Sequence, residues 1–179
     1  MAMDITKFDE SFNSLVVDAL SNYGFRSHGK SVYFMDDIHT VCMIRLGGRR
    51  ARRGSIAYLI CCRHSYLPNM EEKVPTKFES EVQSYPLKLE PGLVKMDNAN
   101  LNISYAKNFN YGNEVFTYED KDDSEIEIFL EELVAEILAV KKWFTSQPES
   151  NLAKQISMSL NRAWVEKIWL EAYERHGAI

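Results

Sequence analysis

Two strand-like runs constrain the fold most strongly, because both of their alternating faces are largely apolar. The runs cover 38–46 and 55–63 and are rich in Val, Ile, Leu, Met and Cys. A strand that is apolar on both faces is usually central in its sheet, with a helix over at least one side. A third run, at 31–35, is aromatic and β-branched, and Asp36-Asp37 after it favours a turn. We therefore expect three consecutive strands in an antiparallel meander.

Apolar residues at helical spacing predict a helix before this meander and two after it. The first helix covers about 7–22 and is capped by Thr6 with Asp9. The other two cover about 122–145 and 148–177. Their apolar faces are Phe8, Phe12, Leu15, Val16, Ala19 and Leu20 in the first helix, Ile126, Leu130, Leu133, Ile137, Val140 and Phe144 in the second, and Leu152, Ile156, Leu160, Trp164, Ile168 and Leu170 in the third.

The middle of the chain has weaker patterns. The segment 64–95 has little periodicity and contains four prolines, which predicts a long connection with a short strand near Leu87. Alternation at 101–105 and at 115–119 predicts one or two further strands, with a turn at 108–113.

These elements together predict one α+β domain over residues 1–179. It has an N-terminal helix, an antiparallel meander sheet of about four to six strands, and two long C-terminal helices packed on the sheet. The composition is 45% hydrophobic, 12% aromatic and 26% charged, which favours a folded chain with a filled core over a disordered one.

The expected compartment follows from targeting and membrane signals that the sequence does not show. The segment 1–8 has no basic n-region, and no run approaches about 18 apolar residues, so we expect neither a secretion signal nor a membrane span. Cys42, Cys61 and Cys62 are odd in number and lie inside strand patterns, which favours a reducing compartment. We therefore expect a cytoplasmic protein.

A loop with four arginines is the sharpest functional feature of a chain whose formal charge is -5. Arg49, Arg50, Arg52 and Arg53 are flanked by glycines, and Arg45 precedes them. Guanidinium groups bind oxyanions in a bidentate manner, so the candidate ligands are phosphate, RNA or an acidic protein surface. The loop has no aromatic residue for stacking, which disfavours single-stranded nucleic acid. A solvated hairpin tip and pairing with the acidic segment are the structural alternatives.

The acidic segment stands at the start of the helix predicted over 122–145. Carboxylates at this position cap a helix and stabilise its positive end, which is one interpretation. The other is an acidic partner face that mimics nucleic acid and occupies a basic cleft. The candidate residues of that face are Glu119, Asp120, Asp122, Asp123, Glu127 and Glu131.

Other motifs give no catalytic, metal or cofactor site. The string at 24–31 formally matches a phosphate-binding loop, but such a loop needs a strand before it and a helix after it, and the predicted order is the reverse. Cys61 and Cys62 would point to opposite faces of one strand, so we expect core thiols and no metal site. No Cys or Ser is placed beside a histidine and a carboxylate. Trp164 and Trp169 lie about 140° apart around a helix, so one is expected to be buried and the other exposed.

The helix over 12–20, the Tyr23-Gly24-Phe25 turn, a short basic stretch and Val32-Tyr33-Phe34 resemble a recurrent bacterial domain of unknown function. This resemblance covers the first third of the chain. It implies an α+β domain in which an apolar helix ends in Gly-Phe and leads into an antiparallel sheet. Several members are encoded near toxin and immunity genes, and the family carries no established catalytic residues.

The sequence and this resemblance lead to three functional hypotheses. The first is a non-enzymatic protein-binding module, immunity-type or inhibitory, that acts by occluding a toxin-like or effector-like partner. The second is a phosphate- or nucleic-acid-binding protein that uses the arginine loop. The third is an enzyme of unrecognised type. The sequence predicts no membrane contact and leaves the oligomeric state open.

Overall fold

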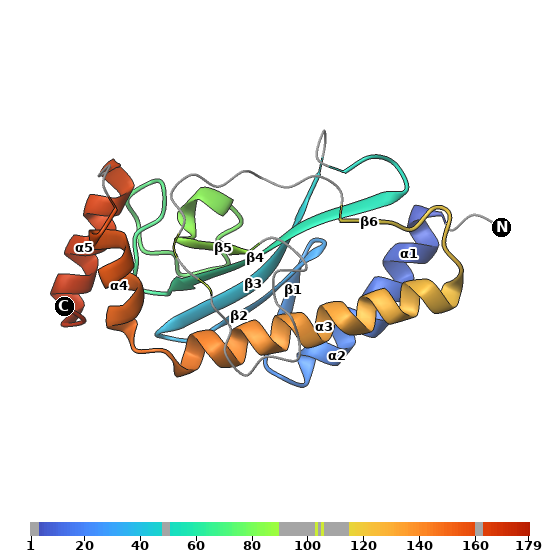
Figure 1. Ribbon diagram of the computed structural model, residues 1–179, viewed down its shortest axis with the longest axis horizontal. Coiled ribbons are helices and arrows are strands. Elements are labelled where there is room, and N and C mark those ends of the chain that lie inside the picture. The colour runs from blue at the N-terminus through green and yellow to red at the C-terminus, as the bar shows by residue number, and fades with distance from the viewer. Residues whose placement is uncertain (1–3, 48–50, 90–102, 104, 106–114, 160–162) are drawn as a thin grey trace.

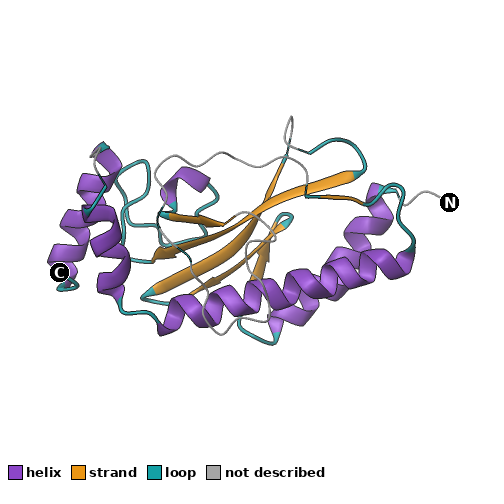
Figure 2. Cartoon of the chain, viewed as in Figure 1, coloured by secondary structure: helices purple, strands orange, loops and turns teal. Residues whose placement is uncertain are grey.

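The computed structural model describes residues 4–47, 51–89, 103, 105, 115–159 and 163–179. In these parts of the chain, six antiparallel strands form one sheet, with the long helix α3 running along one face (Figures 1 and 2). The predicted α+β class is therefore confirmed. None of the helices that the structure describes is long and apolar enough to cross a membrane.

The sheet has the strand order β1-β2-β3-β4-β5, and β6 pairs with the start of β4. The predicted meander is confirmed, and one strand before it was not expected. The bounds are Arg26–His28 for β1, Ser31–Met35 for β2, His39–Leu46 for β3, Ser55–His64 for β4, Leu87–Leu89 for β5 and Phe116–Thr117 for β6. Because β2 follows the 24–31 string, that string is not a phosphate-binding loop.

Strand β4 is central, as its two apolar faces predict. All ten of its residues are buried. Tyr58, Ile60 and Cys62 face the main core with the helices, whereas Leu59 and Cys61 belong to a smaller core on the other face. The alternation of a β-strand thus sends the adjacent cysteines to opposite sides, as expected.

The N-terminal helix is continuous but not uniform. It consists of α1 (Ile5–Phe12), a π-helical turn (Asn13–Val17) and α2 (Asp18–Ser21). The predicted cap was wrong, since Asp4, rather than Thr6, accepts a hydrogen bond from the backbone of Lys7. The predicted apolar face is confirmed at its centre, where Phe8, Phe12, Val16 and Leu20 are fully buried.

Helix α3 covers Asp123–Ser146 and matches its prediction closely. Its six predicted face residues are all buried. The side chain of Asp122 accepts from the Glu125 backbone, and the Glu125 carboxylate accepts from the Asp122 backbone, which completes a capping box.

The single final helix of the prediction is two helices, α4 (Glu149–Ser157) and α5 (Trp164–His176). The Glu166 carboxylate accepts a hydrogen bond from the Ala163 backbone and so starts α5 anew. The break lets α5 pack back beside α4 at one end of the molecule (Figure 1). Apolar spacing continues across the break, so periodicity alone could not reveal it.

The long connection after β4 covers the second face of the sheet. Its Val82 and Tyr85 pack on Cys42, Ile44 and Cys61. The short strand predicted near Leu87 is confirmed as β5.

The later strand predictions fall mostly outside the described residues. Of the run at 101–105, Ile103 and Tyr105 are described, and neither lies in a strand. The expected turn at 108–113 lies outside the described residues. The run at 115–119 contains the short strand β6.

Candidate functional site

Arg45 is held inside the protein. Its Nη1 donates a hydrogen bond to Asp9 Oδ1 at 2.9 Å, and its side chain is only 10% exposed. The guanidinium group also lies 5.7 Å and 5.1 Å from the ring centres of Phe8 and Phe12. Burial opposes ionisation of Asp9, but hydrogen bonds from Arg45 and Lys30 hold the pKa of this carboxyl below its ordinary value. Arg45 thus joins β3 to α1.

The arginine loop itself is described in part. Arg49 and Arg50 lie outside the described residues. Arg52 and Arg53 are exposed just before β4. The backbone N–H and the hydroxyl of Ser55 both donate to the Arg52 carbonyl, at 3.0 and 2.8 Å, so a tight turn presents these two side chains to solvent.

The acidic segment lies against this turn. The Gly54 carbonyl accepts backbone hydrogen bonds from Tyr118 at 2.8 Å and Glu119 at 3.1 Å. Gly54 has a φ of +82°, and a Cβ there would lie 2.7 Å from the Cβ of Glu119. The basic and acidic segments are remote in sequence, yet strand pairing between β4 and β6 makes them neighbours.

Several acidic candidates have structural partners. Asp122 caps α3, Asp123 forms an exposed ion pair with Lys7 at 2.9 Å, and Asp120 lies 3.7 Å from Lys121. Glu127 and Glu131, further along α3, are exposed, as are the four candidates before them. The structural interpretation therefore accounts for the first turn of α3, and the exposed acidic surface continues from that turn along the helix.

A basic groove that the sequence did not predict lies on the second face of the sheet, at its β1–β2 edge. Its volume is about 580 Å³. Arg26 pairs in register with Tyr33 on β2, and His28 follows two residues later on the same strand face. The long connection after β4 closes the other side with Thr76, Lys77 and Phe78. The lining residues are Gly24, Arg26, His28, Tyr33, Met35, Thr76, Lys77 and Phe78.

Aromatic rings form the wall of the basic groove. The rings of Tyr33 and Phe78 stack at 4.7 Å between centres, and the His28 ring lies 5.1 Å from that of Phe78. Because Phe78 comes from the long connection and Tyr33 from β2, only the folded chain brings them together.

The charge of the basic groove is positive. Arg26 and Lys77 line it, and none of its described lining residues is a carboxylate. Within the described parts of the chain, neither cation has an ion-pair partner. The alternation of Arg26 and His28 ahead of an aromatic strand was a sequence signal for one side of this groove. The sequence could not show that Lys77 and Phe78 line the other side, because they are far from Arg26 along the chain.

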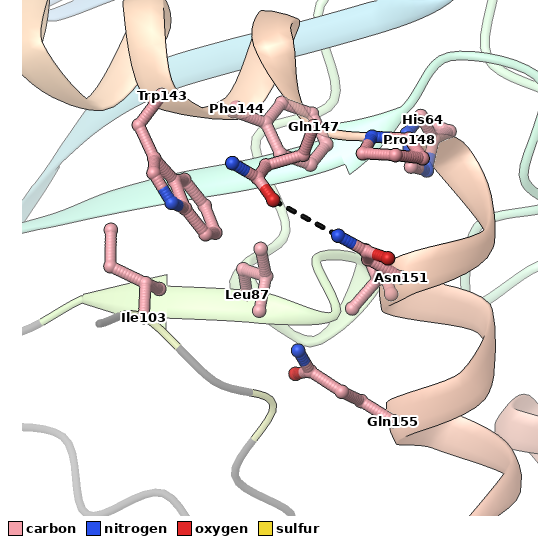
Figure 3. Close-up of a pocket in the computed structure, with 10 residues that line it drawn as sticks. His64, Leu87, Ile103, Trp143, Phe144, Gln147, Pro148, Asn151 and Gln155 are labelled. Atoms are coloured by element: carbon pink, nitrogen blue, oxygen red, sulfur yellow. Dashed lines mark hydrogen bonds between the residues drawn. The ribbon is translucent and has the colours of Figure 1, made fainter. Parts of the chain in front are cut away.

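A second concavity lies between the end of α3, the start of α4 and β5 (Figure 3). Its volume is about 220 Å³. We call it the amide pocket, because three of its side chains are amides. Its lining residues are His64, Leu87, Ile103, Trp143, Phe144, Gln147, Pro148, Asn151, Leu152 and Gln155.

His64 is a buried, neutral residue at the wall of the amide pocket. Its Nδ1 lies 2.6 Å from the Tyr173 hydroxyl. Burial, with smaller contributions from His39 and His176, lowers the pKa of His64 to about 3. The imidazole is therefore uncharged at neutral pH.

Arg63 is the largest buried polar side chain, with 1% of its surface exposed. Its Nη2 donates to the Leu67 carbonyl, whereas Nε and Nη1 have no hydrogen-bond partner in the described part of the chain. The guanidinium lies 5.6 Å from the Tyr85 ring centre, and burial lowers the pKa of Arg63. No group of three or more metal-binding side chains occurs among the residues that the structure describes.

No protein-family model, curated protein or solved structure matches the chain. Function is therefore inferred from the chemistry of the two concave sites.

Proposed function

We propose that the protein is a non-enzymatic binding module that recognises an acidic segment of a partner protein in the basic groove and thereby occludes that segment. The observation that carries this proposal is a groove in which Arg26 and Lys77 lie beside stacked aromatic rings and no carboxylate occurs among the lining residues that the structure describes.

Charge complementarity specifies the ligand. The guanidinium of Arg26 and the ammonium of Lys77 have no ion-pair partner among the described residues. Such groups favour carboxylates, which accept charge-assisted hydrogen bonds. The apolar surfaces of Tyr33 and Phe78 offer contact area to the side chains between those carboxylates. A short segment with two or more acidic residues and an apolar residue between them has the matching chemistry.

A protein segment suits the basic groove better than a nucleic acid does. Bases bind by stacking on free aromatic faces, whereas Tyr33 and Phe78 already stack on each other. A long polyanion also meets repulsion from a chain of formal charge -5. A short acidic segment is affected less, because charges beyond about 10 Å are screened at physiological salt.

The resemblance of the first third to a bacterial domain encoded near toxin and immunity genes favours a toxin-like or effector-like partner. Residues of that resemblance, including Gly24 and Tyr33, line the basic groove. On this proposal the protein is an immunity-type or inhibitory module, and its surface charges chiefly set association rate and partner choice.

Phosphate or nucleic-acid binding through the arginine loop is the second candidate. It is favoured by the exposure of Arg52 and Arg53. It is opposed by Glu119, which lies against Gly54 at the base of the same turn, because a carboxylate there reduces the local positive potential.

A binding assay with defined probes tests both candidates. Fluorescence anisotropy is measured with a labelled peptide that alternates glutamate and leucine, and separately with labelled oligo(dT). We expect the peptide to bind, and the double variant Arg26→Glu, Lys77→Glu to weaken binding at least tenfold. The matched control Lys142→Glu, Arg175→Glu reverses two exposed cations elsewhere and lowers the net charge of the protein to the same extent as the groove variant. After correction for this effect of net charge, the control should bind the peptide within about twofold of the wild-type affinity.

Two results would overturn the proposal. The first is equal peptide affinity in the wild type and in the groove variant. The second is binding of oligo(dT) alone, lost in Arg52→Ala, Arg53→Ala, which would establish the nucleic-acid candidate instead.

A further inference from the structure

We infer that the amide pocket binds a small, uncharged, planar molecule with adjacent hydrogen-bond donors and acceptors, of the nucleobase class. This inference is independent of the basic groove, because none of the residues that line the amide pocket lines that groove.

The size of the amide pocket limits the ligand. Its volume of about 220 Å³ is below the ~300–1,000 Å³ of sites for drug-sized ligands. It corresponds to roughly seven water molecules at ~30 Å³ each. A single heterocycle fits these limits, whereas a complete nucleotide or an extended peptide does not.

The side chains that line the amide pocket favour an uncharged ligand. None of the ten lining residues that the structure describes is Asp, Glu, Lys or Arg. His64 is the only titratable side chain among them, and its imidazole is neutral because its pKa is lowered to about 3. A charged ligand would lose part of its hydration here without gaining an opposite charge.

Hydrogen bonds within the protein orient the amides. Asn151 Nδ2 donates to Gln147 Oε1 at 3.0 Å, and Gln155 Oε1 accepts from the Tyr105 backbone at 2.6 Å. These contacts occupy the Gln155 oxygen and one Asn151 N–H. Gln155 Nε2 is thereby left to donate and Asn151 Oδ1 to accept. Asn151 and Gln155 are four positions apart on α4 and so lie on the same face of the helix, where a donor and an acceptor together can match the N–H and C=O groups of a nucleobase.

An aromatic wall faces these amides. Figure 3 shows Asn151 and Gln155 on one side, Trp143 and Ile103 on the other, and Gln147 between them. Trp143 is partly buried at the end of α3 and packs on Phe144 at 6.3 Å between ring centres. An indole offers a flat apolar surface on which a heterocycle stacks.

The wall of the amide pocket is held in place before a ligand arrives. Tyr173 engages His64 Nδ1, and the Gln147–Asn151 bond joins the end of α3 to the first turn of α4. A preformed site loses less conformational entropy on binding.

Ligand-detected NMR and calorimetry on the full chain test the inference, with adenine, cytosine, uracil and hypoxanthine as probes and benzoate as a charged planar control. We expect saturable one-to-one binding of at least one base with a Kd between about 10 µM and 5 mM, as suits a ligand of some ten heavy atoms. Benzoate should bind at least tenfold more weakly.

Variants locate the binding. The double variant Asn151→Ala, Gln155→Ala should weaken the base at least tenfold, whereas Lys154→Ala, an exposed substitution on the same helix, should leave it unchanged. Circular dichroism and thermal melting establish that each variant is folded. No saturable binding of any base to the folded wild type, or equal affinity in the double variant, overturns the inference. Binding of benzoate as tight as that of the bases also overturns it.

Discussion

The Nδ1 atom of His64 lies 2.6 Å from the hydroxyl oxygen of Tyr173, a residue 109 positions later in the chain. This contact joins the end of the central strand β4 to α5. Both side chains are buried, and burial raises the pKa of Tyr173 well above its ordinary value. A neutral imidazole and a neutral phenol therefore meet inside the protein, and a proton added to His64 would have to enter an apolar site.

Acidification is expected to destabilise the fold through His64. The unfolded residue takes up a proton near pH 6.5 and the folded one near pH 3, so the unfolded state binds more protons between these values. Stability is thus complete above about pH 6.5 and falls with pH through this window, by at most ~1.4 kcal/mol per unit. Chemical denaturation from pH 7.5 to 4 measures the loss, and His64→Gln should flatten the profile.

Neighbouring groups sharpen this pH test. His39 on β3 and His176 on α5 oppose protonation of His64. Asp9 and Asp36 also have lowered pKa values, but their ordinary value is 3.8, so their contribution is lost below about pH 4. A wild-type profile that is flat between pH 6.5 and 4.5 would contradict a buried neutral His64.

The partly buried Arg45–Asp9 pair should stabilise the protein more than an exposed pair does. Arg45→Ala is expected to lower the free energy of unfolding by ~1–3 kcal/mol, since it leaves Asp9 with a weaker partner and removes contacts with two phenylalanine rings. Lys7→Ala breaks the exposed pair with Asp123 and should cost less than ~1 kcal/mol. Urea denaturation compares the two, and equal losses would argue against the anchoring role.

Gly54 should tolerate substitution poorly. Gly54→Ala forces a side chain into a left-handed conformation and against Glu119 at 2.7 Å, with an expected loss of ~2–4 kcal/mol. Gly29 has a φ of +57° with no atom near its Cβ position, so Gly29→Ala should cost only ~1 kcal/mol. Thermal melting of both variants separates the loss of stability caused by contact with Glu119 from the loss caused by the left-handed backbone conformation alone.

Replacement of the buried Arg63 should be neutral or stabilising. Arg63→Met removes a guanidinium group that has two unpaired nitrogen atoms, while keeping an unbranched chain over Tyr85. Exchange of a buried charge for an apolar side chain often leaves stability unchanged or raises it by ~1–4 kcal/mol. A decrease of more than ~2 kcal/mol in the free energy of unfolding would show that the guanidinium group stabilises the fold despite its two unpaired nitrogen atoms.

The three cysteines should be unreactive while the protein is folded. Cys42, Cys61 and Cys62 are completely buried, and burial raises the pKa of Cys61 and Cys62 well above the ordinary value. Thiolate is the reactive form, so labelling by a disulfide reagent should follow the rate of unfolding. Fast labelling of one thiol in the native protein would indicate local opening around β4.

Local patterns predicted much of the fold. The period of two identified β2, β3 and β4, and the period of 3.6 identified α1 and α3, because each element has to bury one or both of its faces. The same reasoning correctly expected one of Trp164 and Trp169 to be exposed and the other buried, and Trp169 donates its indole N–H to the Pro68 carbonyl.

The patterns failed where partners are distant in sequence. The break before α5 depends on Glu166 and on packing against α4, neither of which alters apolar spacing. Arg45 was grouped with the arginine loop by its position, yet a strand directs it to Asp9. The basic groove and the amide pocket each combine side chains from separate segments, so no short motif could reveal them.

The sequence by itself therefore determined the α+β class, the central apolar strands and the main amphipathic helices, because these depend on residues a few positions apart. Only the tertiary structure decided where charge is paired and where it is presented to a ligand. Register between β3 and β4, and the return of the long connection over the second sheet face, set those distances, and electrostatic and hydrogen-bond energies depend on distance and burial rather than on order along the chain.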